Sequence, residues 1–184
     1  MRACQAALHF RDLSAHAING VTLRTRIGLH TGTANVGNFG SPERVDYTAL
    51  GESVNLASRL EGLNKHLGTH CLISAEAQAG IGGSLLTRPL GSFQMKGFEN
   101  PVIVHELLGW PEQAEATRAW REAFAEALNN YEQRNLAFAE MGFRRVLELR
   151  PDDGPAKFYL ERMAELAAQK LPDDWVTHTI LREK

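Results

Sequence analysis

The sequence is poor in cysteine and has no long apolar run. Only Cys4 and Cys71 occur among its 184 residues, which excludes the disulfide framework of a small secreted domain. Both thiols are expected to be reduced and to lie in apolar surroundings. No stretch approaches the roughly 20 apolar residues that span a bilayer, and the first residues lack the apolar centre of a signal peptide. These absences predict a cytoplasmic protein.

The sequence also lacks a large excess of charge of one sign, with 20 basic and 22 acidic residues and a formal net charge of −2. This balance provides no polybasic field for nucleic acid or for an anionic membrane surface. His66 and His70 have the i, i+4 spacing of some zinc sites, but Gly68 lies between them and no glutamate follows the first histidine. We therefore predict neither a nucleic-acid partner nor a zinc site.

Hydrophobic spacing divides the first 109 residues into helices and strands. Strands are expected at 21–29, 45–50, 71–74, 85–90, 91–96 and 102–108, and helices at 2–17, 53–67 and 76–80. Mixed elements in this order favour an α/β layer with the helices on one face of a sheet.

Composition changes after residue 109, where glycine almost disappears and alanine and glutamate dominate. Three amphipathic helices are predicted, with the apolar residues Trp120, Phe124, Leu128 and Tyr131, then Leu136, Ala139, Phe143 and Leu147, then Tyr159, Leu160, Met163 and Leu166. The segment 151–155 ends the second helix and caps the third. We divide the chain into a mixed region, 1–109, and a helical tail, 110–184. The tail is expected to be a separable unit that docks on the sheet or on a partner.

The tail has one partial match to a tetratricopeptide repeat. Ala139, Phe143 and Pro151 follow the spacing of the second helix of such a repeat, whereas Tyr131 falls one place out of register. A solenoid needs about three repeats. The tail is therefore predicted to be a TPR-like helical appendage and not a solenoid.

One strand–glycine–helix segment carries candidate chemistry. The strand 45–50 is ended by Gly51, and Ser53 is expected to cap the helix that follows. The helix has an apolar stripe formed by Leu56, Leu60, Leu63 and Leu67. Asn55 and Arg59 lie one turn apart beside that stripe. An amide and a guanidinium in this arrangement could bind a phosphate group.

Two segments together resemble the C-terminal half of a class III nucleotide cyclase catalytic domain. They run from Arg26 to Gly32 and from Tyr47 to Glu61, and the whole resemblance extends from about Ile27 to Leu108. The resemblance implies an α+β, ferredoxin-like cyclase sheet that begins in its middle, followed here by an all-α appendage. Any membrane anchor of a longer protein would then lie in a preceding segment.

The resemblance also implies roles for four residues. Asn55 and Arg59 correspond to the family's transition-state pair, and Thr48 lies where the family contacts the purine. Lys96, in Lys96-Gly97, resembles a late lysine that approaches the nucleotide phosphates. A threonine at the purine position favours ATP, so the implied reaction is the conversion of ATP to cyclic AMP and pyrophosphate in signal transduction. A solvated lysine and an ordinary strand threonine are the plainer interpretations of Lys96 and Thr48.

The family's two metal-binding aspartates, which hold Mg²⁺ or Mn²⁺, have no counterpart in this sequence. Residues 1–20 contain one acidic residue, Asp12, on a predicted helix, and no second carboxylate that could complete a metal-binding pair. We therefore predict no metal ligands in this chain and no activity of the chain alone.

Three functions remain open at this point. The first is part of an adenylate cyclase, whose active site would form in a homodimer. The second is a non-catalytic cyclase-like module that binds a nucleotide, or a protein through the helical tail. The third takes the tail as the main element of a helical adaptor.

Overall fold

A five-stranded sheet forms the centre of the computed structural model, which describes residues 1–14, 25–41, 43–168, 175 and 177–180. The strand order is β1-β4-β6-β5-β7. The strands are β1 (Ile27–Leu29), β4 (Cys71–Ser74), β5 (Leu86–Gln94), β6 (Val102–Gly109) and β7 (Thr179–Ile180). β1 pairs with β4, and β7 with β5, in parallel, while β6 runs antiparallel to both of its neighbours.

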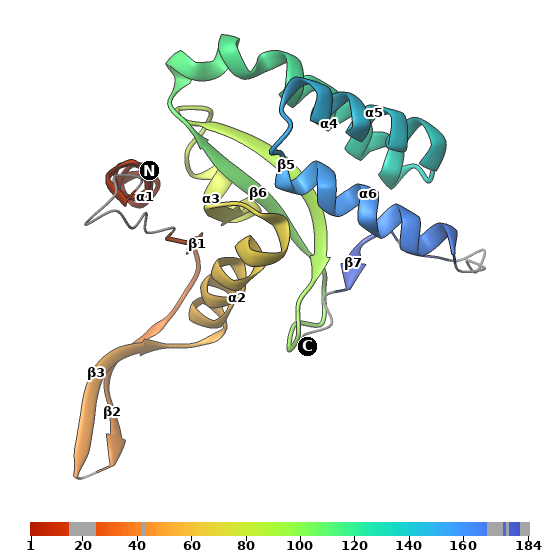
Figure 1. Cartoon of the computed structure of the whole chain (residues 1–184). Coiled ribbons are helices and arrows are strands. Elements are labelled where there is room, and N and C mark those ends of the chain that lie inside the picture. Colours follow the sequence, from red (N-terminus) through yellow and green to blue (C-terminus); the bar gives the residue numbers. More distant parts are fainter. Residues whose placement is uncertain (15–24, 42, 169–174, 176, 181–184) are drawn as a thin grey trace, which may run out of the picture.

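Helices cover both faces of this sheet (Figure 1). The helices are α1 (Arg2–Ser14), α2 (Glu52–Leu67), α3 (Ala75–Ala79), α4 (Ala114–Glu132), α5 (Leu136–Leu149) and α6 (Gly154–Ala167), with a short 3₁₀ turn at Pro111–Gln113. One apolar core joins α2 and the tail helices to one face, and a second joins α1 and α3 to the other. The mixed α/β architecture is confirmed, but the prediction that helices cover one face only is wrong.

The second core contains both cysteines. Cys4 and Cys71 are buried and form no disulfide. Burial raises the pKa of the Cys71 thiol to about 12, because a thiolate is poorly solvated among apolar side chains. The expected apolar surroundings of the two thiols are therefore confirmed.

A hairpin, β2 (Asn35–Ser41) and β3 (Arg44–Leu50), forms a separate two-stranded sheet. It projects away from the rest of the molecule in Figure 1. Val36, Val45 and Tyr47 are 61%, 56% and 76% exposed. The alternation of the predicted strand therefore does not bury one face within this chain.

The helix after this hairpin has the predicted stripe but not the predicted cap. Leu56, Leu60, Leu63 and Leu67 are all buried. α2 begins at Glu52, with Gly51 at the N-cap position and no side-chain capping bond, so the prediction that Ser53 caps the helix is wrong. Gly51 has φ 135°, which favours glycine and lets the chain turn from β3 directly into the helix.

Other boundaries differ for tertiary reasons. The strands expected at 85–90 and 91–96 form one strand, β5, with a register shift between Pro89 and Gly91 and φ 97° at Gly91. A bulge thus takes the place of the expected turn. The helix predicted at 2–17 ends at Ser14 among the described residues. The strand predicted at 21–29 is restricted to β1, and the predicted positions 15–17 and 21–24 lie outside the described residues.

The tail packs on the sheet, which is one of the two dockings predicted for it. Phe124, Phe143 and Tyr159 belong to the same core cluster as Leu72 and Phe93 of the sheet. The chain then returns to the sheet as β7, a strand that the sequence patterns did not reveal. None of the described helices combines the length and apolarity needed to cross a membrane.

Candidate functional site

Helix α2 lies directly on strand β1. A Cβ atom on Gly28 would be 2.2 Å from the Ala57 carbonyl oxygen and 2.3 Å from the Glu61 amide nitrogen, so only glycine allows this approach. Asn64 Nδ2 also donates to the Ile27 carbonyl oxygen at 3.0 Å. These contacts fix the position of the helix that carries Asn55 and Arg59.

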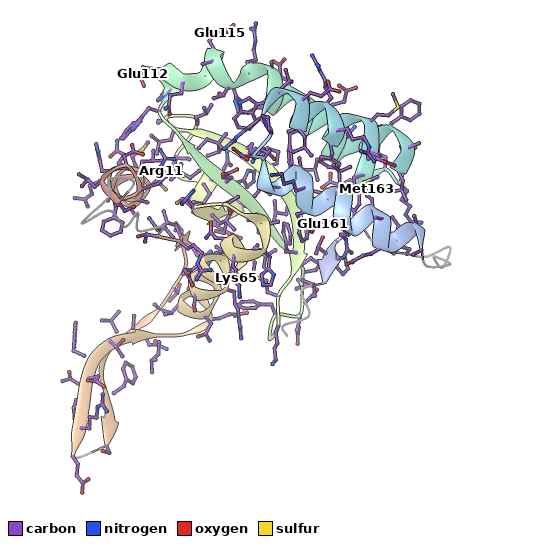
Figure 2. The ribbon with its side chains drawn as sticks, viewed as in Figure 1. Arg11, Lys65, Glu112, Glu115, Glu161 and Met163 are labelled. Carbon is purple, nitrogen blue, oxygen red and sulfur yellow. The ribbon has the colours of Figure 1, made fainter. Side chains whose placement is uncertain are left out.

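Arg59 and Lys96 meet at one cavity of about 230 Å³ between α2 and the segment that follows β5. Its lining is Ser58, Arg59, Gly62, Leu63, Lys65, His66, Met95 and Lys96. The lining contains basic side chains and no carboxylate, so the cavity suits an anionic group. Lys65 is labelled on α2 in Figure 2.

The other two predicted site residues lie outside this cavity. Asn55 is exposed on α2, one turn before the half-buried Arg59. Thr48 is exposed on β3, where it is paired with Gly37. The structure therefore brings two of the four residues together and leaves Asn55 and Thr48 on neighbouring surfaces.

The sequence patterns did not predict a polar cluster that lies near the start of α2. His30 Nδ1 lies 2.8 Å from Ser74 Oγ and 3.5 Å from Glu76 Oε2. The hydrogen bond that Ser74 makes with the Glu76 carboxyl is the main cause that lowers the pKa of that carboxyl. A Cβ on Gly32 would meet both Ser53 Oγ, at 2.3 Å, and His30 Nε2, at 2.8 Å. His30 thus lies in the loop between β1 and β2, where it faces the start of α2. Its place beside Gly28 and Gly32 was the only local signal.

The sequence model of the adenylate and guanylate cyclase catalytic domain matches residues 1–109. Because this match covers more than half of the chain, the chain belongs to that family. The predicted resemblance is therefore confirmed, whereas the TPR-like character of the tail stays a prediction.

Two relatives extend the comparison. The chain is 41% identical over 123 residues to adenylate cyclase 1 of Rhizobium meliloti (strain 1021), covering 64% of this chain and 18% of that protein. It is 28% identical over 171 residues to the terminal-differentiation-specific adenylate cyclase of Dictyostelium discoideum, covering 88% of this chain and 8% of that protein. The chain thus spans less than a fifth of the length of these relatives.

Two solved structures support the same fold. The guanylate cyclase domain of RhGC from Catenaria anguillulae, in complex with GTP, superposes with a TM-score of 0.51 at 26% identity, covering 59% of each chain. The catalytic core of a rhodopsin-guanylyl cyclase with converted specificity, in complex with ATPαS, gives 0.50 at 26% identity, covering 59% of this chain and 58% of that one.

Cyclase domains of this family generally use Mg²⁺ or Mn²⁺. Within the described part of the chain, no group of three or more histidine, cysteine, aspartate or glutamate side chains is placed to hold a metal ion. These hard cations prefer several oxygen ligands. The described residues therefore do not fit the ions.

Proposed function

We propose that this chain is part of an adenylate cyclase that converts ATP to cyclic AMP and pyrophosphate in signal transduction. The observation that carries the proposal is the meeting of Arg59 and Lys96 at one cationic cavity, although they come from different elements. The 41% identity to a protein named adenylate cyclase 1 gives independent support.

In this reaction the ribose 3′ oxygen attacks the α-phosphorus, and the bond from that phosphorus to the pyrophosphate oxygen breaks. The hydroxyl proton is released as the ring closes. Arg59 would stabilise the charge that grows on the phosphate oxygens, because a guanidinium is a planar, bidentate donor. Asn55, one turn earlier on α2, would orient the ribose. Divalent ions supply phosphate charge neutralisation in such cyclases, and no residue described in this chain is assigned to that task.

Thr48 and Lys96 would contact the two ends of the nucleotide. A threonine hydroxyl can accept a hydrogen bond from the adenine amino group, which favours ATP over GTP. Lys96, exposed after β5, would approach the phosphates as a point charge. Comparison of ATP and GTP as ligands of the 184-residue chain tests this preference.

The cyclase is proposed to act as a homodimer through the hairpin β2–β3. An isolated two-stranded hairpin is only marginally stable in water, and clustered exposed apolar side chains mark interaction sites. Val36, Val45 and Tyr47 provide such side chains. A second copy that covers them would stabilise the hairpin and keep Thr48 in place on β3.

Two assays test the proposed activity. The 184-residue chain alone is expected to produce no cyclic AMP above background with Mg²⁺ or Mn²⁺, so metal-dependent production would contradict the residue assignment. Joined to a segment that supplies the metal-binding aspartates, the chain is expected to turn over ATP. In that protein Arg59→Ala should lower kcat by about 10²–10³-fold with a smaller change in KM, because its donors act mainly in the transition state.

Arg144→Ala is the matched control, since Arg144 is an exposed arginine on α5 that pairs with Glu140. It should leave both kinetic constants unchanged. If Arg59→Ala instead raised KM at constant kcat, Arg59 would be a ground-state binding residue.

The alternative function is a non-catalytic module that binds a nucleotide or a protein. It is favoured by the lack of a metal-binding cluster among the described residues. Phe138 and Met141, exposed on α5, offer a protein partner an apolar contact through the tail. Nucleotide binding by the chain, combined with no turnover once the aspartates are supplied, would favour this alternative.

A further inference from the structure

A buried ion cluster joins the tail to the sheet. Arg88 of β5 is 2% exposed; its Nη1 lies 2.7 Å from Asp153 Oδ2 and its Nη2 lies 2.7 Å from Glu106 Oε2. The guanidinium also faces the rings of Trp120 and Phe124 of α4, at 4.8 and 4.6 Å. Two carboxylates and two aromatic rings therefore enclose an arginine that lies in the region that matches the cyclase family, residues 1–109.

Asp153 has a second contact as the N-cap of α6. Its Oδ1 accepts a hydrogen bond from the Ala156 amide at 2.9 Å. The same fully buried carboxylate thus begins the helix and pairs with Arg88. Removing Asp153 would leave Glu106 as the only carboxylate paired with Arg88 among the described residues. Loss of one partner of a buried ion pair is strongly destabilising, so this residue of the sheet helps to fix where α6 starts.

The first residue of α6 touches the end of α2. A Cβ atom on Gly154 would lie 2.2 Å from the Leu67 carbonyl oxygen and 2.9 Å from Gly68 Cα. Gly68 ends α2 in the left-handed conformation, with φ 64°. Because backbone meets backbone here, a shift of the start of α6 is transmitted directly to α2.

Helix α6 also holds strand β5. The Tyr159 hydroxyl donates to the Leu90 carbonyl oxygen at 2.6 Å. A Cβ on the neighbouring Gly91 would come within 2.4 Å of that hydroxyl, so the Tyr159 hydroxyl packs closely against the backbone of both Leu90 and Gly91. Lys96 follows the end of β5, and Arg59 lies on α2. Helix α2, which lines the cationic cavity, and strand β5, whose following segment lines it, therefore both contact α6.

We propose that Arg88 and Asp153 are positioning residues for the cavity formed by Arg59 and Lys96. Their ion pair holds α6 against the end of α2 and the side of β5, and these two elements set the separation of the two cationic groups. The coupling is a property of the packing, whereas its importance for turnover rests on the proposed cyclase function.

The test is NMR spectroscopy of the ¹⁵N-labelled 184-residue chain with Asp153→Asn, which removes the charge but retains a capping oxygen. We expect the side-chain Nε–Hε signal of Arg59 to shift. Amide exchange in the last turn of α2 should rise about tenfold, with α1 and α3 unchanged. Asp152→Asn is the matched control, because Asp152 is exposed beside the cluster, and it should reproduce the wild-type spectrum.

Gly154→Ala provides a second variant that leaves every charge in place. Its methyl group would press on the Leu67 carbonyl oxygen, so the same signals should change even if Asp153→Asn does not fold. The proposal would be overturned if amide exchange rose in α6 while the Arg59 signal and the end of α2 stayed unchanged. An equal rise in amide exchange in α1 and α3 would overturn it as well. Neither readout needs turnover. An inactive cyclase with a responsive Arg59 would therefore contradict the proposed function and leave the coupling intact.

Discussion

The β2–β3 hairpin and the helical tail place their apolar residues in opposite environments. The hairpin belongs to the region that matches the cyclase family, yet Val36, Val45 and Tyr47 are exposed on it. The tail lies beyond the family match, yet Phe124 and Phe143 are fully buried in a core shared with the sheet. Membership of the family region and integration into the fold are therefore separate properties.

The difference follows from what each region finds within its own chain. The tail helices meet an apolar sheet face, and the tail also supplies Asp153 to a buried arginine and β7 to the sheet edge. Apart from its connections to β1 and α2, the hairpin projects away from the rest of the molecule (Figure 1). We expect another molecule to cover the exposed apolar side chains of the hairpin. Phe124 and Phe143 of the tail are already covered in the core shared with the sheet of the same chain.

Removal of the tail should give the largest effect. A chain ending at Leu108 would expose Leu90 and Phe93 and leave Arg88 without Asp153. Each large apolar side chain contributes roughly 1.5–3 kcal/mol when buried, and a whole domain is stable by only about 5–15 kcal/mol. We expect circular dichroism to show no cooperative thermal transition, the opposite of what the composition change at residue 109 suggests.

The comparison requires the matched deletion of the hairpin. Replacement of residues 36–49 by a short Gly-Ser linker should leave the melting temperature within a few degrees of wild type, because those residues bury little in this chain. A cooperative transition in the tail-less chain, or loss of folding without the hairpin, would reverse the contrast between the two regions.

A pair of phenylalanines on one helix should give the next largest effect. Phe143 is 0% exposed and stacks on Tyr159, with ring centroids 4.9 Å apart, whereas Phe138 of the same helix is 66% exposed. Phe143→Ala should reduce the free energy of unfolding by about 3–5 kcal/mol, and Phe138→Ala by less than about 0.5 kcal/mol. Urea unfolding measures both; similar losses would show that α5 is not packed as described.

The smallest change in stability is expected in the hairpin. Tyr47→Ser should alter the free energy of unfolding by less than about 0.5 kcal/mol, since Tyr47 is 76% exposed. It should nevertheless weaken self-association in sedimentation experiments, because it removes an apolar contact proposed for the dimer. Unchanged association would argue against the hairpin as the dimer contact.

Local patterns were sufficient for most elements. The stripe from Leu56 to Leu67 predicted the buried face of α2, and the segment 151–155 predicted the cap that Asp153 provides. Local patterns predicted only part of the candidate site. Asn55 and Arg59 share a helix, so their spacing placed them one turn apart, but only Arg59 lines the cavity. By contrast, Arg59 meets Lys96, and His30 meets Ser74 and Glu76, across separate elements. Short sequence spacings cannot predict contacts between residues that lie so far apart in the chain.

The sequence by itself determined the family, the amphipathic faces and the change of composition after residue 109, because these depend on residue types and short spacings. Only the tertiary structure decided that Arg88 pairs with Asp153 as well as with Glu106 and that β7 joins β5. It also decided that the apolar residues of the hairpin stay exposed while those of the tail are buried. Burial and ion pairing depend on which surfaces meet in space, and that meeting is set by packing of the whole chain.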